Sequence, residues 1–401
     1  MDLDFLSKLI KNADTKIVMI VIDGIGGLPK EEDNKTELEL AYTPNLDKLA
    51  YNGICGLHTP VGSGITPGSG PGHLGIFGFN PKKYQIGRGV LEALGIDFIL
   101  KPGDIAARGN FCTIDENGII CDRRAGRIST EKNQQLCRIL SDHVYIPTAK
   151  VFIKTVKEHR FLIVLRGEGL KGNLIDTDPQ KIGIKPLEPK GGIGSDKTVE
   201  IVKKLLNQTK DILSDHHPAN MVLLRGFSEK PSWPNFPKVF GLNSAAIACY
   251  PMYRGLASLI GMDIIETGQS IEDEFKTLKE NWDKYDFFFL HVKKTDSYGE
   301  DGDFNSKVKV IEKVDELIPS LMNLKPDVVI ITGDHSTPSI LKSHSWHPVP
   351  LLIWSKYCRP DNVKEFGERS CIVGSLGPMF PATDIIPTAL ANAQRFEKFG
   401  A

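Results

Sequence analysis

KIVMIVIDGIGG, residues 16–27, is an apolar run that ends at Asp23 and a glycine turn. A short run without polar alternation is typical of a strand that is buried on both faces of a parallel sheet. Further strands are expected at residues 285–292, 327–333 and 349–355, and helices at residues 43–53, 305–323 and 383–393. Strands that alternate with helices predict an α/β fold, in which a mostly parallel sheet has helices on both faces and binds ligands beyond the carboxyl ends of its strands.

The middle of the chain has a different pattern. GNFCTIDENGIICDRR, residues 109–124, predicts a β-hairpin, and the strand-like segments KVFIKTV and RFLIVLRG precede the helical segment DKTVEIVKKLLNQT. We therefore expect residues 1–106 and 223–401 to form a core domain, and residues 107–222 to form a smaller α/β lobe that is inserted into it.

The composition is that of a globular protein without a strong charge bias. The chain has 401 residues, of which 41% are hydrophobic, and its 49 basic and 50 acidic residues give a formal net charge of -1. We therefore expect neither nucleic acid nor a membrane as a partner. Seven cysteines without a CxxC pair indicate reduced thiols, and no signal peptide or apolar run of roughly 20 residues is present. These features predict a cytoplasmic protein.

GITPGSGPGHLGIFGFNP, residues 64–81, contains one serine, Ser69, among glycines and prolines. No lysine follows as in a phosphate-binding P-loop, and Pro67 stands where a GxSxG nucleophile elbow needs its first glycine. The segment is expected to be a loop rather than a helix or a regular strand. It is either a surface turn, or a loop whose small residues let the backbone approach an anion and leave Ser69 exposed as a nucleophile.

Three aspartates, Asp23, Asp296 and Asp334, follow predicted core strands. Each one alone is explained as a helix cap or a turn residue. Because parallel strands bring their carboxyl ends to one edge of a sheet, the three carboxylates together would repel one another unless cations lay between them. His335 and His344 add imidazole nitrogens to the same region. This set of oxygen and nitrogen ligands can hold two divalent ions.

A divalent ion would give the lone serine a chemical role. Coordination to such an ion lowers the pKa of a hydroxyl group, so Ser69 could attack a phosphorus atom. A pair of ions would also neutralise charge on the attacking and leaving oxygens. The residues therefore predict metal-assisted phosphoryl transfer.

A resemblance to a known family extends over nearly the whole chain. It is carried, in chain order, by VIDGIGG, YTPNLDKLA, TPGSGPGHLGIFGFNP, GRGVLEALG, GDIAARGNFCTID, DRRAGRI, LRGEGL, HVKKTDSYGEDGDF, TGDHSTP and HPVPLLIW. Together these segments resemble the archaeal-type cofactor-independent phosphoglycerate mutases of the alkaline phosphatase superfamily. The resemblance implies an isomerase that moves phosphate between the 3- and 2-hydroxyls of glycerate through a phosphoserine, without 2,3-bisphosphoglycerate.

The resemblance also implies roles for individual residues. Ser69 would be the nucleophile and would share one metal with Asp23, Asp334 and His335. Asp296 and His344 would hold a second metal, with His347 as the competitor of His344. Related enzymes often have histidine four residues after the aspartate, in a DxxGH arrangement, whereas this chain has Glu300. Glutamate can still coordinate, and its harder oxygen favours Mg²⁺ or Mn²⁺.

Phosphoglycerates carry a phosphate and a carboxylate, which arginine and lysine bind well. The candidate substrate-binding residues are Arg108, Arg124, Arg127, Arg166, Arg225, Arg254 and Lys294. Metals and a nucleophile alone do not distinguish a mutase from a metal-dependent phosphatase or another phosphotransferase of the same superfamily. A catalytically inactive, metal-binding scaffold is a further alternative, and the sequence leaves open whether the chain forms a homo-oligomer.

Overall fold

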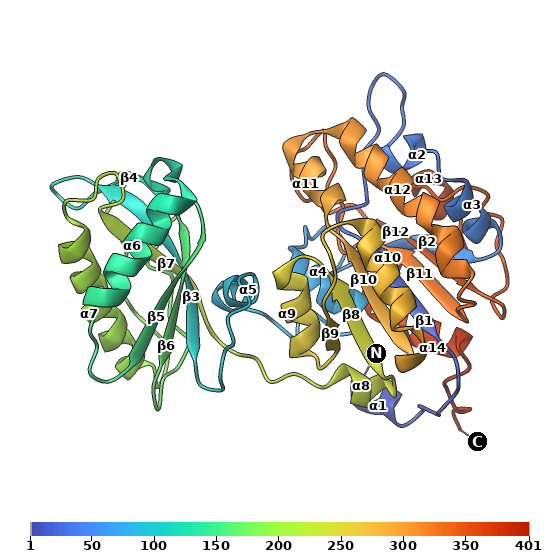
Figure 1. Ribbon diagram of the computed structural model, residues 1–401, viewed down its shortest axis with the longest axis horizontal. Coiled ribbons are helices and arrows are strands. Elements are labelled where there is room, and N and C mark those ends of the chain that lie inside the picture. The colour runs from blue at the N-terminus through green and yellow to red at the C-terminus, as the bar shows by residue number, and fades with distance from the viewer. Residues whose placement is uncertain (1, 401) are drawn as a thin grey trace. The chain divides into compact units, whose positions relative to one another are not determined.

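The computed structural model describes residues 2–400, which form two compact units (Figure 1). Unit 1 contains the residues up to Gln85 and those from Trp233 onward, and unit 2 contains Ile86–Ser232. The expected boundaries at residues 107 and 222 differ from this division, because they fall inside strands β3 (Ile105–Ile114) and β7 (Met221–Glu229). Helix α5 (Arg88–Leu94) packs on both of these strands and therefore belongs to unit 2.

Unit 1 is built on an eight-stranded sheet. In spatial order the strands are β13 (Gly377–Pro381), β2 (Ile54–Thr59), β12 (Val349–Ser355), β11 (Val328–Thr332), β1 (Ile17–Ile22), β10 (Phe287–Val292), β8 (Ser244–Ala248) and β9 (Asp263–Ile265). Strand β12 is antiparallel to both of its neighbours, and all other neighbouring pairs of this sheet are parallel. The predicted α/β class with a mostly parallel sheet is confirmed.

Strand β1 lies in the interior of this sheet, and all six of its residues are buried, as its apolar run predicts. It pairs in parallel with β10 and β11, so that Ile22 is opposite Val292 and Val21 is opposite Thr332. Because these three parallel strands end opposite one another, the segments that follow them begin at the same edge of the sheet.

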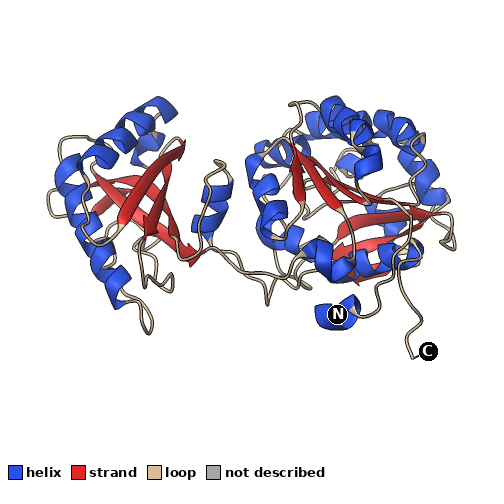
Figure 2. Cartoon of the chain, turned by 60° about the horizontal axis from the view of Figure 1, so that its bottom comes forward, coloured by secondary structure: helices blue, strands red, loops and turns tan. Residues whose placement is uncertain are grey.

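Helices cover both faces of the sheet (Figure 2). In unit 1 they are α1 (Leu3–Ser7), α2 (Glu37–Leu40), α3 (Pro44–Tyr51), α4 (Ser69–Ile76), α8 (Phe236–Phe240), α9 (Pro251–Leu259), α10 (Ile271–Glu280), α11 (Lys294–Asp301), α12 (Phe304–Met322), α13 (Glu368–Ile372) and α14 (Ile385–Asn392). The predicted helices at residues 43–53, 305–323 and 383–393 correspond to α3, α12 and α14. Between residues 2 and 400, no helix combines the length and apolar character needed to cross a membrane.

Unit 2 contains a five-stranded antiparallel sheet. Besides β3 and β7, its strands are β4 (Ile120–Asp122), β5 (Lys150–Lys157) and β6 (Arg160–Arg166). Helices α6 (Thr130–His143) and α7 (Asp196–Leu213) pack together on one face of this sheet (Figure 1). The predicted hairpin is formed by β3 and β4, and Gly118 provides the positive φ of 76° that its turn requires.

The glycine- and proline-rich segment is helical where a loop was predicted, because Ser69–Ile76 form α4. The prediction was wrong because tertiary packing, rather than intrinsic propensity, stabilises this helix. A Cβ atom on Gly72 would lie 2.3 Å from the carbonyl oxygen of Asp334. Glycine therefore allows α4 to pack directly against the segment after β11. Pro71 lies in the first turn, where its missing N–H removes no helical hydrogen bond.

Candidate active site

Two carboxylates and an imidazole meet at the edge of the sheet in unit 1. Asp23 directly follows β1, and Asp334 and His335 follow β11. The His335 Nε2 atom lies 3.3 Å from Asp23 Oδ1 and 3.2 Å from Asp334 Oδ2. Ser69 Oγ lies 3.4 Å from the same nitrogen. The side chains of Asp23, Asp334 and His335 are fully buried, whereas Ser69 is half-buried.

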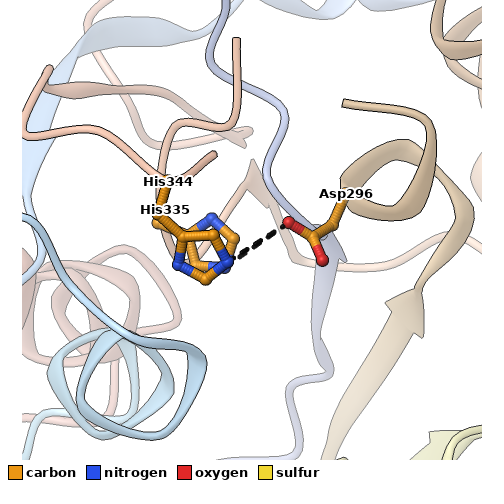
Figure 3. Close-up of side chains that lie close together, drawn as sticks. All are labelled: Asp296, His335 and His344. Atoms are coloured by element: carbon orange, nitrogen blue, oxygen red, sulfur yellow. Dashed lines mark ion pairs between the residues drawn. The ribbon is translucent and has the colours of Figure 1, made fainter. Parts of the chain in front are cut away.

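A second group shares His335 with the first. Asp296, on α11, and His344, in the loop before β12, complete it, and their ligand atoms all lie within 4.8 Å of one another. The His344 Nε2 atom is 3.5 Å from Asp296 Oδ1, and the two imidazole rings stack with centroids 3.6 Å apart (Figure 3). Glu300 Oε1 lies 3.8 Å from His344 Nε2, so the glutamate that replaces the expected histidine faces this group.

Hydrogen bonds orient both imidazoles with Nε2 toward the carboxylates. The Nδ1 atom of His335 lies 2.8 Å from Thr337 Oγ1, whose hydroxyl donates to Asp296 Oδ1 at 2.9 Å. The Nδ1 atom of His344 is 2.9 Å from the Pro67 carbonyl oxygen, to which it can only donate. With the proton on Nδ1, each Nε2 atom has a free lone pair, as a metal ligand requires.

The electrostatics of the carboxylate pair fit bound cations. Asp23 Oδ1 and Asp334 Oδ2 are buried and accept no hydrogen bond among the described residues, although imidazole nitrogens lie 3.1–3.3 Å from them. An unpartnered buried carboxylate oxygen is costly, and divalent ions remove that cost. The residues present therefore fit a metal centre of mixed oxygen and nitrogen ligands.

Lys293 places its positive charge beside the carboxylates of Asp23 and Asp296. Its Nζ atom lies 3.0 Å from Asp23 Oδ2 and contacts Asp296 Oδ2. Burial acts to raise the pKa of Asp23, but the charge of Lys293 and the contact with His291 hold that pKa well below its ordinary value. Burial would lower the pKa of Lys293, and the two carboxylates raise it above its ordinary value. Asp23 and Lys293 are therefore both charged near neutral pH.

Ser69 is the first residue of α4. The backbone N–H groups of this first turn have no helical acceptor, and a helix N-terminus favours an anion. His73, one turn further along, places Nδ1 2.9 Å from the Ser69 carbonyl oxygen and 3.1 Å from Asp334 Oδ2. It thus links the backbone of the serine to a carboxylate of the first group.

Unit 2 carries a separate cluster of cationic side chains. They line a cavity of about 380 Å³. Its lining residues are Arg88, Arg108, Asn110, Arg123, Arg124, Arg127, Glu158, His159, Arg160, Gln180 and Arg225. Four of the predicted substrate-binding arginines, Arg108, Arg124, Arg127 and Arg225, are among them. We call the cavity that these residues line the arginine cavity.

The register of the antiparallel strands brings these arginines together. Arg108 on β3 is directly opposite Arg225 on β7, and Asn110 is opposite Arg160 on β6. Directly opposite residues share one face of a sheet, and like charges in that position repel. An anion bound between them would remove the repulsion, so the cavity suits a phosphate or a carboxylate.

Acidic partners hold some of these arginines in place. Arg123 makes a bidentate pair with Asp178, at 2.9 and 2.7 Å, and Arg108 pairs with Glu92 of α5. Arg225 Nε lies 3.5 Å from Asp176 and 3.7 Å from Asp178. Fixed guanidinium groups lose little conformational entropy when an anion binds.

The structure places the other predicted residues elsewhere. Arg166 lies at the far end of β6 from Arg160, about 20 Å along the strand, and makes a bidentate pair with buried Asp104 at 2.7 and 2.6 Å. Arg254, on α9, donates to the Cys249 carbonyl oxygen at 3.3 Å. Lys294 is exposed. His347 is hydrogen-bonded to Ser345 Oγ at 3.0 Å and belongs to neither candidate metal group, which favours His344 over His347 as the candidate metal ligand.

Sequence reasoning missed several residues near these sites. In unit 1 they are Lys293, His73, His291 and Tyr253, and in unit 2 they are Arg88, Arg123, His159 and Arg160. Lys293 could have been found, because it lies three residues before Asp296 and such a pair shares one helix face. Arg160 could not, since its place depends on strand pairing.

Unit 1 is an α/β unit with carboxylates and imidazoles at one edge of its sheet, and unit 2 is an antiparallel unit with an arginine cavity. Comparison with known proteins is more specific. The family model for 2,3-bisphosphoglycerate-independent phosphoglycerate mutase matches residues 50–220. A protein of Aquifex aeolicus named "Probable 2,3-bisphosphoglycerate-independent phosphoglycerate mutase" is 54% identical and covers 100% of both chains. A relative of the same name from Thermus thermophilus is 49% identical over 99% of this chain and 98% of its own.

Solved structures agree with this similarity. The cofactor-independent phosphoglycerate mutase from Thermoplasma acidophilum has a TM-score of 0.72 and 28% identity over 94% of this chain and 100% of its own. A Pyrococcus horikoshii protein has a TM-score of 0.80 and 30% identity over 96% of this chain and 99% of its own. The chain belongs to the family of 2,3-bisphosphoglycerate-independent phosphoglycerate mutases, which are isomerases.

Proposed function

We propose that this chain interconverts 3-phosphoglycerate and 2-phosphoglycerate through a phosphoserine on Ser69, at a site that holds two divalent metal ions. The observation that carries the proposal is the position of Ser69 Oγ, which lies 3.4 Å from His335 Nε2, the nitrogen that is itself 3.3 Å from Asp23 Oδ1 and 3.2 Å from Asp334 Oδ2. The names of this chain's relatives point to the same substrates. None of the proposed steps needs 2,3-bisphosphoglycerate.

The residues divide into two ligand sets. Asp23, Asp334, His335 and Ser69 would hold one ion, and Asp296, His344 and Glu300 would hold the other. When bound, Mg²⁺ or Mn²⁺ lowers the pKa of a coordinated hydroxyl and neutralises charge on phosphate oxygens. The carboxylate oxygens of both sets favour these harder ions over softer ones.

The proposed reaction has two in-line transfers. Ser69 Oγ loses its proton and attacks the phosphorus of 3-phosphoglycerate, the bond from phosphorus to the 3-oxygen breaks, and that oxygen gains a proton. The 2-hydroxyl of the retained glycerate then attacks the phosphoserine and loses its proton, while Ser69 Oγ leaves and is protonated. Lys293, whose Nζ contacts the carboxylates of Asp23 and Asp296, would bind a phosphate oxygen during the transfers.

The arginine cavity is proposed to bind the anionic groups of the substrate. Arg108, Arg124, Arg127 and Arg225 all line it, which supports a substrate-binding role for the smaller lobe. Retention of glycerate distinguishes a mutase from a phosphatase, because a retained alcohol competes with water for the phosphoserine.

The test is a ³¹P NMR time course of the metal-loaded protein with 3-phosphoglycerate and no added 2,3-bisphosphoglycerate. The proposal expects the 2-phosphoglycerate signal to grow to equilibrium while inorganic phosphate stays absent. Free phosphate without 2-phosphoglycerate would identify a phosphatase instead. Acid quenching during turnover, followed by peptide mapping, should find the phosphoryl group on the peptide that contains Ser69.

A further inference from the structure

Tyr253 lies behind the first ligand set and is fully buried. It belongs to α9, and its hydroxyl donates a hydrogen bond of 2.5 Å to Asp23 Oδ2. Of the nine tyrosines, all of which lie within residues 2–400, only Tyr253 has a buried side chain. A buried hydroxyl needs a partner, and here that partner is a carboxylate of the proposed metal site.

The ring of Tyr253 has little freedom to move. It stacks on His291 with centroids 3.6 Å apart and an interplanar angle of 25°, and His73 lies on it at 4.7 Å. Both histidines are themselves fully buried. Because close packing blocks other rotamers, the hydroxyl is held in one position against Asp23.

The two oxygens of Asp23 have different surroundings. Oδ2 accepts from Tyr253 and from Lys293 Nζ at 3.0 Å, and His291 Nε2 lies 3.4 Å away. Oδ1 has no hydrogen-bond partner among the described residues and faces His335 Nε2 at 3.3 Å. Protein donors thus occupy one oxygen and leave the other for a ligand on the side of the imidazole.

We propose that Tyr253 is a positioning residue, which holds Asp23 so that only Oδ1 is offered to the metal of the first set. This inference rests on the metal site of the proposed function. Hydrogen bonds to metal-ligating carboxylates fix their orientation, and removing such a partner typically weakens metal binding by about 10- to 100-fold. A tyrosine that only filled space in the core would have no such effect once its ring was retained.

Tyr253→Phe tests the inference, because phenylalanine keeps the stacked ring and removes only the hydroxyl. The matched control is Tyr285→Phe, which also removes one tyrosine hydroxyl, from a ring that packs against Phe288 and belongs to neither ligand set. Mn²⁺ binding to the metal-free proteins is measured by the EPR signal of the free ion. We expect about 10- to 100-fold weaker binding for Tyr253→Phe and unchanged binding for Tyr285→Phe.

The outcomes separate this inference from the function on which it rests. Wild-type protein that binds no Mn²⁺ would refute the metal site itself. Wild-type protein that binds Mn²⁺, with Tyr253→Phe binding equally well, would refute only the role of Tyr253. Activity of Tyr253→Phe should also recover when Mn²⁺ is raised in proportion to the loss of affinity, which a general packing defect would not do.

A double-mutant cycle asks whether the effect passes through Asp23. In an Asp23→Asn background the carboxylate is gone, so Tyr253→Phe should weaken Mn²⁺ binding by less than about twofold. Full additivity of the two substitutions would contradict the inference.

A measurement on the wild-type fold covers the case in which Tyr253→Phe does not fold. The chain is labelled uniformly with 3-fluorotyrosine, and the buried residue is identified as the ¹⁹F resonance that a soluble relaxation agent does not broaden. Mg²⁺ should shift this resonance, because a metal on Oδ1 withdraws electron density from the carboxylate that accepts the hydrogen bond. A buried resonance that stays unshifted while Mg²⁺ binds would overturn the inference.

Discussion

The two units gather charges of opposite sign: unit 1 gathers carboxylates and unit 2 gathers arginines. In unit 1, carboxylates gather at the carboxyl ends of parallel strands, where they are fully buried and two of their oxygens lack hydrogen-bond partners. In unit 2, arginines face one another across an antiparallel sheet and line a cavity. The first arrangement calls for cations and the second calls for an anion. Each unit therefore gathers charge of one sign that a ligand of opposite charge would neutralise, as the proposed function requires.

The largest expected effect is that of Ser69→Ala, which removes the proposed nucleophile from unit 1 and leaves the proposed metal-binding carboxylates in place. Turnover of 3-phosphoglycerate should fall by about 10⁴-fold or more, because no other group can carry the phosphoryl intermediate. Circular dichroism should be unchanged. Activity within about tenfold of wild type would mean that the phosphate takes another route.

Chelation tests the requirement of unit 1 for cations. Treatment with EDTA should reduce turnover by about 10³-fold, since metal ions contribute several kcal/mol to stabilising the transition state. Mn²⁺ or Mg²⁺ added to the dialysed protein should restore the activity. A metal-free preparation, verified by elemental analysis, that remained active would refute the two-metal site.

Arg225→Ala tests the requirement of unit 2 for an anion. Loss of a charge-assisted hydrogen bond of about 1.5–3 kcal/mol should lower kcat/KM by about 10- to 100-fold. Arg138→Ala, at an exposed position of α6, is the matched control and should leave kcat/KM unchanged. Equal kcat/KM values for the two variants would remove the arginine cavity from the substrate site.

Glu300→His should change which metal unit 1 prefers. Replacing a carboxylate with an imidazole favours borderline ions, so the ratio of activity with Co²⁺ to activity with Mg²⁺ should rise by about fivefold. The ratio is measured on metal-free protein reloaded with each ion. A constant ratio would indicate that Glu300 does not coordinate.

Arg166→Ala sharpens the boundary of the anion site in unit 2. The substitution leaves Asp104 buried without its bidentate partner, so the free energy of unfolding should fall by about 1–3 kcal/mol. Because Arg166 lies outside the arginine cavity, kcat/KM should be unchanged. A lower kcat/KM in the folded variant would extend the substrate site to this end of β6.

The sequence predicted unit 1 better than unit 2 for a physical reason. Asp23 and Asp334 were expected near one another because parallel strands place their ends at one edge, whatever the exact register. The position of Arg225 opposite Arg108 depends on antiparallel register, which a strand's own residues do not determine.

Two other features of the site depended on tertiary contacts. The helix that begins at Ser69 has a glycine-rich sequence, and only its packing shows why it is helical. Tyr253 stands in an unremarkable helical segment, and its hydroxyl meets Asp23 across 230 residues of chain. Neither the helix at Ser69 nor the contact between Tyr253 and Asp23 could be predicted from the local sequence pattern.

Gly72 has a consequence for how this active site can vary. Its missing side chain lets α4 lie against the carbonyl of Asp334, where a Cβ would come within 2.3 Å. The absence of a Cβ at this position therefore sets how closely α4, which begins at Ser69, can pack against the segment that carries Asp334. Even alanine would force α4 and Ser69 away from Asp334 while leaving every proposed reactive group chemically intact, so Gly72 would constrain the proposed reaction without taking part in it.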